Sequence, residues 1–150
     1  MSFAELAHRL AASYDKDVGS GAPATDIESA EMRLGVRIDG GFRDFLLLFG
    51  WGGVSHIELY GLGPDVPTHL DLIAITESER QEMHPPLPMA LVPITNDGSG
   101  NLLCITLQVQ SGNESPVFLW QHDHPDGSKQ LLRQEASTFA EWLSDELDRL

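Results

Sequence analysis

Residues 42–53 read FRDFLLLFGWGG and mark the point at which the predicted structure changes from helices to strands. The apolar side chains of this stretch recur at helical spacing, at Phe42, Phe45, Leu46 and Phe49. This spacing predicts an amphipathic helix. Glycine adopts backbone conformations that break a helix, and three glycines end this one, at Gly50, Gly52 and Gly53.

Two more helices are predicted before this stretch. The first carries an apolar stripe, formed by Phe3, Leu6, Ala7, Leu10, Ala11 and Tyr14. The second begins at Thr25, which has a capping-box spacing with Glu28. It ends at Gly35, because glycine tolerates the left-handed conformation that closes a helix. Residues 15–23 between the two helices, DKDVGSGAP, predict a loop.

The chain beyond the glycine-rich run is dominated by predicted strands. They are expected at 56–60, 70–75, 91–95, 101–109 and 116–121. The turn at 96–101, NDGSGN, joins two of these strands as a hairpin, and Pro93 indicates an edge strand or a bulge. A short helix is predicted over 76–83, since Thr76 and Glu79 repeat the capping-box spacing.

A closing helix is predicted from a third capping-box spacing, that of Thr138 with Glu141. Its apolar face consists of Phe139, Trp142, Leu143, Leu147 and Leu150. The whole pattern predicts an α+β fold with N-terminal helices, a central mostly antiparallel sheet and a C-terminal helix. The length of 150 residues predicts a single domain over residues 1–150.

The charge of the chain restricts its possible partners. Twenty-three Asp and Glu against nine Lys and Arg give a net charge of −14. This charge argues against direct binding of nucleic acid or of an anionic membrane surface, and it favours a cationic partner. Self-repulsion also favours a monomer. The chain has no apolar stretch long enough to cross a bilayer and no signal-peptide layout at its start, so we expect a cytoplasmic protein.

One cluster of residues suggests metal chemistry. His122 and His124 would face one side of a strand, where they could bind a metal together with a carboxylate such as Asp123 or Asp126. The turn residues that follow favour a polar loop instead. Residues 97–101 resemble part of a calcium loop, but they lack its distant glutamate and favour a tight turn.

Two further side chains have alternative interpretations. Cys104, the only cysteine, lies in an apolar run and is expected to be a buried, unreactive thiol in a protein of a reducing compartment. Trp51 stands among glycines that cover it poorly, so it either packs into the core, which we favour, or contacts a partner. The sequence therefore predicts no catalytic residues, no metal site and no cofactor, and we expect the protein not to be an enzyme.

Five motifs follow one another in a fixed order. They are IESAEMRLG at 27–35, FRDFL at 42–46, LVPI at 91–94 with NDGSGN at 96–101, VFLW at 117–120 followed by His122 and Asp123, and STFAEWL at 137–143. In this order and spacing they resemble the SUKH superfamily, which unites bacterial immunity proteins with yeast cell-wall-synthesis regulators. The resemblance covers residues 25–147 and implies a SUKH-like fold.

The resemblance implies a non-enzymatic immunity protein that neutralises a cognate bacterial toxin by stoichiometric occlusion. The negative charge fits a basic toxin domain, such as a nuclease. We expect contacts from loops and strand ends of the strand-rich half, at Trp51, Glu58, Asp97, Asp123 and Asp126. One alternative is a cytoplasmic interaction adaptor of the same fold without a toxin partner. Another is a metal-dependent hydrolase centred on the histidine cluster.

Overall fold

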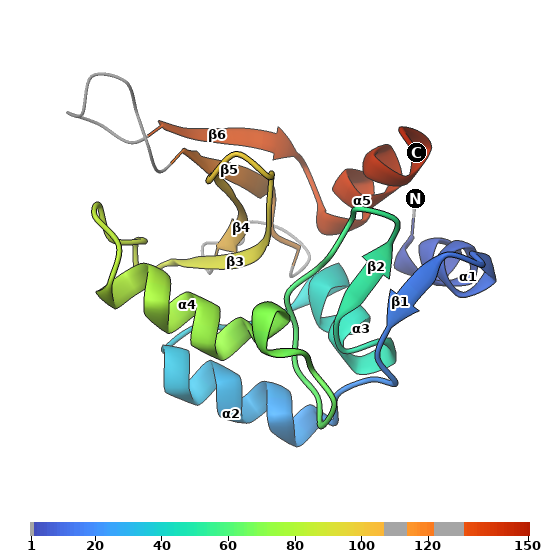
Figure 1. The fold of residues 1–150 in the computed structure, drawn as a ribbon, viewed down its shortest axis with the longest axis horizontal. Coiled ribbons are helices and arrows are strands. Elements are labelled where there is room, and N and C mark those ends of the chain that lie inside the picture. The colour runs from blue at the N-terminus through green and yellow to red at the C-terminus, as the bar shows by residue number, and fades with distance from the viewer. Residues whose placement is uncertain (1, 107–113, 122–130) are drawn as a thin grey trace.

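The computed structural model describes residues 2–106, 114–121 and 131–150 (Figure 1). Along these residues the chain forms, in order, α1 (Phe3–Ala12), β1 (Lys16–Val18), α2 (Ala24–Leu34), α3 (Gly40–Leu48), β2 (Gly52–Val54), a 3-10 turn (Thr68–Leu70), α4 (Leu72–Gln81), β3 (Leu91–Asn96), β4 (Leu102–Thr106), β5 (Val117–Gln121), β6 (Leu131–Ala136) and α5 (Phe139–Asp148). The predicted α+β fold is confirmed, with helices leading, an antiparallel sheet following and a helix closing the chain.

Four strands form the main sheet in the order β3-β4-β5-β6, each antiparallel to its neighbour. The predicted hairpin at 96–101 is confirmed, because it joins β3 to β4. Pro93 lies in β3 at the end of this strand order, and the register shifts between Pro93 and Thr95. Both expectations for this proline, an edge position and an irregular ladder, therefore hold.

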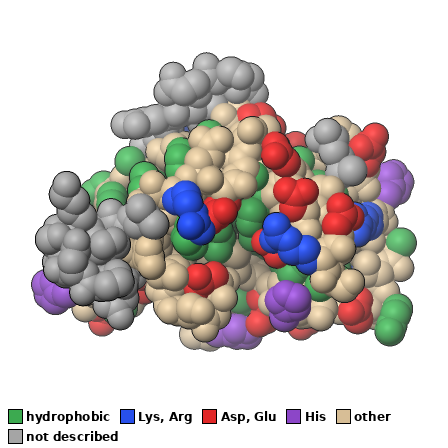
Figure 2. Space-filling model, turned by 90° about the horizontal axis from the view of Figure 1, so that it is seen from above, with side chains coloured by type: hydrophobic (Ala, Val, Ile, Leu, Met, Phe, Trp, Pro, Cys, Tyr) green, Lys and Arg blue, Asp and Glu red, His purple; other side chains and the backbone are tan. Residues whose placement is uncertain are grey.

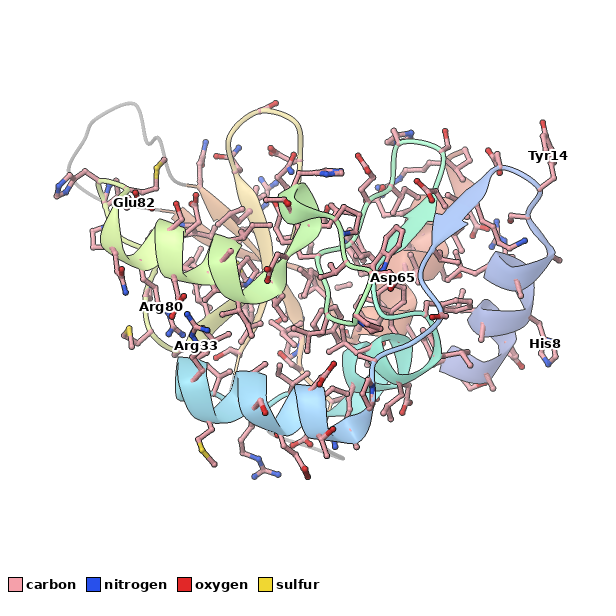
Figure 3. The ribbon with its side chains drawn as sticks, turned by 60° about the horizontal axis from the view of Figure 1, so that its bottom comes forward. His8, Tyr14, Arg33, Asp65, Arg80 and Glu82 are labelled. Atoms are coloured by element: carbon pink, nitrogen blue, oxygen red, sulfur yellow. The ribbon has the colours of Figure 1, made fainter. Side chains whose placement is uncertain are left out.

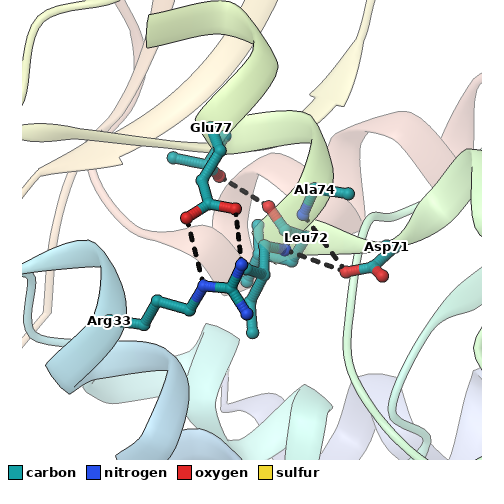
Figure 4. A network of polar contacts seen from close by, with 7 residues as sticks. Arg33, Asp71, Leu72, Ala74 and Glu77 are labelled. Atoms are coloured by element: carbon teal, nitrogen blue, oxygen red, sulfur yellow. Dashed lines mark hydrogen bonds and ion pairs between the residues drawn. The ribbon is translucent and has the colours of Figure 1, made fainter. Parts of the chain in front are cut away.

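α4 and α5 pack against β3 and β6, the two outer strands of the sheet, and an ion pair joins each of them to a further helix (Figure 1). Arg33 of α2 donates two hydrogen bonds to the carboxylate of Glu77 in α4, at 3.0 and 3.1 Å (Figure 4). At the other end of the molecule, Arg9 of α1 pairs with Asp148 of α5 at 2.8 Å. The two chain ends consequently lie near each other (Figure 1).

An aromatic cluster holds α1, α3 and α5 together. The ring of Phe139 lies 5.4 Å from that of Phe42 and 6.1 Å from that of Phe45, measured between centroids. Phe3 and Trp142 contact the same ring at 6.2 and 6.1 Å. Because these side chains come from three helices, the cluster fixes how the helices pack on one another.

The predicted strand at 70–75 is wrong, since α4 begins at Leu72. Asp71 caps this helix, and its carboxylate accepts hydrogen bonds from the backbone N–H groups of Ile73 and Ala74 (Figure 4). Thr76, the predicted cap, lies inside the helix and donates its hydroxyl to the carbonyl of Leu72. A short apolar run is compatible with either a buried strand or a buried helix. Here the N-terminal cap that Asp71 provides favours the helix.

The predicted strand at 56–60 is also wrong, although its alternating pattern reflects real burial. Ile57 and Leu59 are buried, whereas Glu58 is exposed. The segment runs beside the edge of β3, where the N–H of Tyr60 donates to the carbonyl of Ile94 at 2.8 Å. Only Leu59 forms a bridge, to Gly52 in β2. The alternation thus correctly indicated which side chains face inward, but it did not indicate a continuous ladder.

Three strands form where the sequence predicts none, and one of them, β2, lies in the glycine-rich run that was predicted only to end a helix. β1 lies inside the predicted loop at 15–23 and pairs with β2, with Lys16 opposite Val54. β6 has the sequence LLRQEA, whose residues favour helices, and it is a strand because it pairs with β5. Each of these strands is defined by its pairing partner, so the residues of the strand alone do not reveal it.

The helix ends are predicted with mixed success. Gly35 ends α2 in the left-handed conformation, with φ 68°, as expected. Thr138 caps α5 by accepting a hydrogen bond from the N–H of Glu141, also as expected. The predicted cap at Thr25 is wrong, because α2 begins at Ala24 after Pro23 and has no side-chain cap.

The predicted apolar faces of the terminal helices each include one residue too many. α1 ends at Ala12, so Tyr14 lies beyond it and is 99% exposed. Leu150 lies beyond the end of α5 and is also exposed. In the predicted strand at 101–109, β4 spans Leu102–Thr106, and the residues after it lie outside the described part of the chain.

Cys104 lies in β4 with its side chain fully buried, as predicted. Burial raises the pKa of its thiol well above the ordinary value, so the reactive thiolate is scarce at neutral pH. We expect the native protein not to react with Ellman's reagent at mildly alkaline pH, and to react with one equivalent after denaturation, as it has one cysteine. Equally fast reaction of the native and denatured protein would contradict this expectation.

Candidate functional site

Trp51 immediately precedes β2, and its side chain is 8% exposed. Its indole lies directly against Gly19, where a Cβ atom would meet the indole nitrogen. The same nitrogen donates a hydrogen bond to the carboxylate of Asp65 at 3.1 Å (Figure 3 labels Asp65). Trp51 therefore belongs to the hydrophobic core, the interpretation favoured from the sequence, and its role as a partner contact stays a prediction.

Glu58 lies on the segment beside the edge of β3, with half of its side chain exposed. Its carboxylate is 3.3 Å from Nε2 of His69, and its backbone carbonyl accepts a hydrogen bond from the hydroxyl of Thr95 at 2.6 Å. The second contact fixes the backbone of Glu58 against β3. The carboxylate is consequently presented to solvent from a backbone position tied to the sheet.

Asp97 organises the turn between β3 and β4. Its Oδ1 accepts hydrogen bonds from the N–H groups of Ser99 and Asn101 at 2.8 and 3.1 Å, and its Oδ2 accepts one from the Asn101 amide at 3.0 Å. The predicted tight turn is thus confirmed. Partial burial by itself would raise the pKa of Asp97, but these hydrogen bonds outweigh it and hold the pKa below the ordinary aspartate value. Asp97 is therefore negatively charged at neutral pH.

Asp97 lies on the rim of a groove between this turn and α5. The groove consists of two adjoining hollows of about 340 and 230 Å³, both lined by Asp97, Leu103, Trp142 and Glu146. Leu103 and Trp142 are more than nine-tenths buried and form its apolar floor. We call it the acidic groove, and its charged and titratable rim residues are His56, Asp97, Arg133, Glu135, Asp145, Glu146 and Arg149.

Negative charge predominates on the rim of the acidic groove, with four carboxylates against two guanidinium groups. Arg133 pairs with Glu135 at 2.8 Å and Arg149 pairs with Glu146 at 3.0 Å, so the two arginines are already engaged. Within the described part of the chain, Asp145 has no cationic side chain within 4 Å. Figure 2 views the side of the molecule that carries β6 and α5 and shows acidic side chains interleaved with a few basic ones around apolar surface.

The helical spacing of its apolar residues predicts Trp142 on the apolar face of the closing helix, but its acidic neighbours were not among the predicted contacts. Asp145 and Glu146 follow Trp142 by three and four residues, so all three lie on one side of α5. An aromatic residue with two carboxylates at helical spacing was a signal that could have identified this face. What the sequence could not show is that the turn carrying Asp97 folds against it.

The other predicted site residues lie elsewhere. Asp123 and Asp126 are outside the described residues, as are His122 and His124 of the predicted metal cluster. Within residues 2–106, 114–121 and 131–150, no group of three or more His, Cys, Asp or Glu side chains is placed to hold a metal ion. In the same part of the chain, every helix is too short or too polar to span a membrane.

Comparison with protein families finds a match over most of the chain. The family SUKH_5, described as SMI1-KNR4 cell-wall, matches residues 4–148. The matched range begins in the first turn of α1 and reaches the last residue of α5, so it includes the aromatic cluster apart from Phe3 and the acidic groove apart from Arg149. No curated protein matches the chain.

Proposed function

The chain belongs to the SUKH_5 family of SMI1-KNR4 cell-wall proteins, and on this basis we propose that it is an immunity protein that binds and neutralises a cognate bacterial toxin with a basic surface. Family membership is consistent with an immunity-like or an SMI1/KNR4-like role, and it indicates protein–protein interaction. The family is generally non-catalytic. The proposed mechanism is accordingly occlusion, in which one molecule covers the active site of one toxin domain in the cytoplasm.

The acidic groove is the observation that carries this proposal. Protein interfaces commonly combine a buried aromatic anchor with a polar rim. The groove has this composition, with Trp142 in its floor and Asp97 and Asp145 on its rim. An arginine or lysine side chain of a partner could lay its apolar stem on the tryptophan and place its charge beside the carboxylates.

The charge of the whole molecule supports the same class of partner. A net charge of −14 accelerates encounter with a basic protein and disfavours acidic partners. A nuclease domain offers such a basic surface, because it must bind a phosphate backbone. We propose Glu58, Asp97 and Asp145 as the carboxylates that face it, and the predicted contacts Trp51, Asp123 and Asp126 stay part of the proposal.

The first experiment uses the protein as bait for a toxin domain encoded by a neighbouring gene, or for a lysate where no such gene exists. The proposal expects a one-to-one complex in which the toxin is inactive. A folded and active toxin domain that fails to bind would refute it. Recovery of several housekeeping proteins instead would favour the adaptor role, which the SMI1-KNR4 description of the family also suits.

Charge reversal locates the contact surface within that complex. Asp145→Lys should lower the association rate constant at low salt about tenfold and weaken its salt dependence, as measured by stopped-flow mixing with the toxin domain. Glu28→Lys is the matched control, since Glu28 is an exposed residue of α2 outside the acidic groove and the net charge changes by the same amount.

The control separates local contact from long-range steering. If the two variants slow association equally, only the total charge matters and the acidic groove is not the contact surface. Asp97→Asn complements the pair, because its Oδ1 can still accept the two backbone hydrogen bonds that hold the turn while the charge is lost. Substitution by lysine at this position would disturb the turn itself.

A further inference from the structure

An apolar groove lies between α1 and α3, on residues that line no part of the acidic groove. Its volume is about 630 Å³. We call it the α1–α3 groove, and the residues that matter for its chemistry are Ala4, Ala7, Ala11, Asp44, Leu47 and Leu48. Figure 3 shows His8, which also lines it, pointing outward from α1.

Some of the apolar side chains that line this groove are exposed and do not belong to the hydrophobic core. Phe45 and Leu46 of α3 are fully buried, whereas Leu47 and Leu48 after them are 42% and 51% exposed. A surface helix normally carries polar residues on its outer side. Apolar surface that no neighbouring element covers can serve as an interaction site.

The shape of the groove fits an α-helix. Its walls are two helices, and one of them presents alanine at positions 4, 7 and 11, which repeat at helical spacing. Small side chains let another helix approach closely, and apolar helix faces dock in grooves of this kind. α1 has ten residues and is therefore about 15 Å long, enough to contact roughly three turns of a docked helix.

The charged side chains that line the groove indicate which kind of partner helix would fit it. Among the described residues, Asp44 is the one carboxylate that lines the groove, and no lysine or arginine lines it. Within the described part of the chain, no cationic side chain lies within 4 Å of the Asp44 carboxylate. A partner with a lysine or arginine beside its apolar face would supply the missing charge. A second copy of this chain would bring another net charge of −14 and a second Asp44.

We propose that the α1–α3 groove binds an amphipathic, basic α-helix of another protein. The apolar side of that helix rests on Leu47, Leu48 and the alanines of α1, and a lysine or arginine faces Asp44. This site is separate from the acidic groove and does not depend on the proposed immunity function. Together with the acidic groove of the proposed function, it would give the protein two binding surfaces, so that a second partner or a second segment of the same partner could be held.

A pair of synthetic peptides tests the site. One is a fluorescent leucine–lysine peptide of about five helical turns with its leucines on one side, and the other is a scrambled peptide of the same composition. Fluorescence anisotropy should show that the wild-type protein binds the amphipathic peptide about tenfold more tightly than the scrambled one. The double variant Leu47→Gln, Leu48→Gln should lose this preference, and Asp44→Lys should weaken binding of the amphipathic peptide more than Glu28→Lys does.

Controls address folding and nonspecific attraction. Met32→Gln removes an exposed apolar side chain of α2 and should leave the preference unchanged. Circular dichroism should show a native fold for every variant, since the substituted side chains are exposed. Equal binding of the two peptides, or an undiminished preference in the leucine variant, would overturn the proposal. It would also be overturned by a wild-type dimer in light scattering that the leucine variant converts to a monomer, because the groove would then bind a second copy.

Discussion

Replacement of Phe139 by alanine is expected to lower the free energy of unfolding by about 3–5 kcal/mol. The ring is 1% exposed and contacts four other aromatic rings, which are those of Phe3, Phe42, Phe45 and Trp142. Its removal leaves a cavity where α1, α3 and α5 meet, and each neighbouring ring loses a contact. Urea denaturation followed by tryptophan fluorescence measures the change.

Two further variants make this prediction decisive. Tyr14→Ala also removes an aromatic ring, but that ring is 99% exposed, so the change in stability should stay within about 0.5 kcal/mol. Phe139→Leu retains much of the buried volume and should cost about 1–2 kcal/mol, which leaves a folded protein to measure if the alanine variant does not fold. A loss for Phe139→Ala no larger than that for Tyr14→Ala would show that the aromatic cluster does not hold the helices together.

Gly52→Ala is expected to lower the free energy of unfolding by about 2–5 kcal/mol. Gly52 has φ 96°, a conformation that side-chain-bearing residues rarely adopt. A Cβ atom there would also collide with the carbonyl oxygen of Asp17 and lie 2.9 Å from the Cα atom of Val18. The substitution therefore forces β1 and β2 apart, and thermal or urea denaturation would detect the loss.

Gly100→Ala isolates the steric part of this effect. Gly100 has φ 92°, close to that of Gly52, but a Cβ atom there would meet no atom within 4 Å. It should cost about 1–2 kcal/mol, from backbone strain alone. The difference between the two variants measures the close approach of β1 to β2, and equal losses would show that this approach contributes nothing to stability.

The residues predicted from the sequence as partner contacts coincide only in part with those that line the acidic groove. Asp97 and Glu58 were chosen because they lie near strand ends, and the structure presents both as exposed carboxylates. Only Asp97 lines the acidic groove, together with Asp145 and Glu146, which were not predicted. The groove joins a turn and a helix more than forty residues apart in the chain, and no local pattern records that contact.

The sequence by itself determined the fold class, the hairpin at 96–101, the ends of α2 and α5 at Gly35 and Thr138, and the burial of Cys104. These features depend on residues close together in the chain, where side-chain periodicity, turn chemistry and capping act directly. Only the tertiary structure decided that β1 and β6 are strands and that Trp142 forms the floor of a groove. Each of these depends on contacts with another element of the fold, because strand pairing and surface shape are properties of the packed chain.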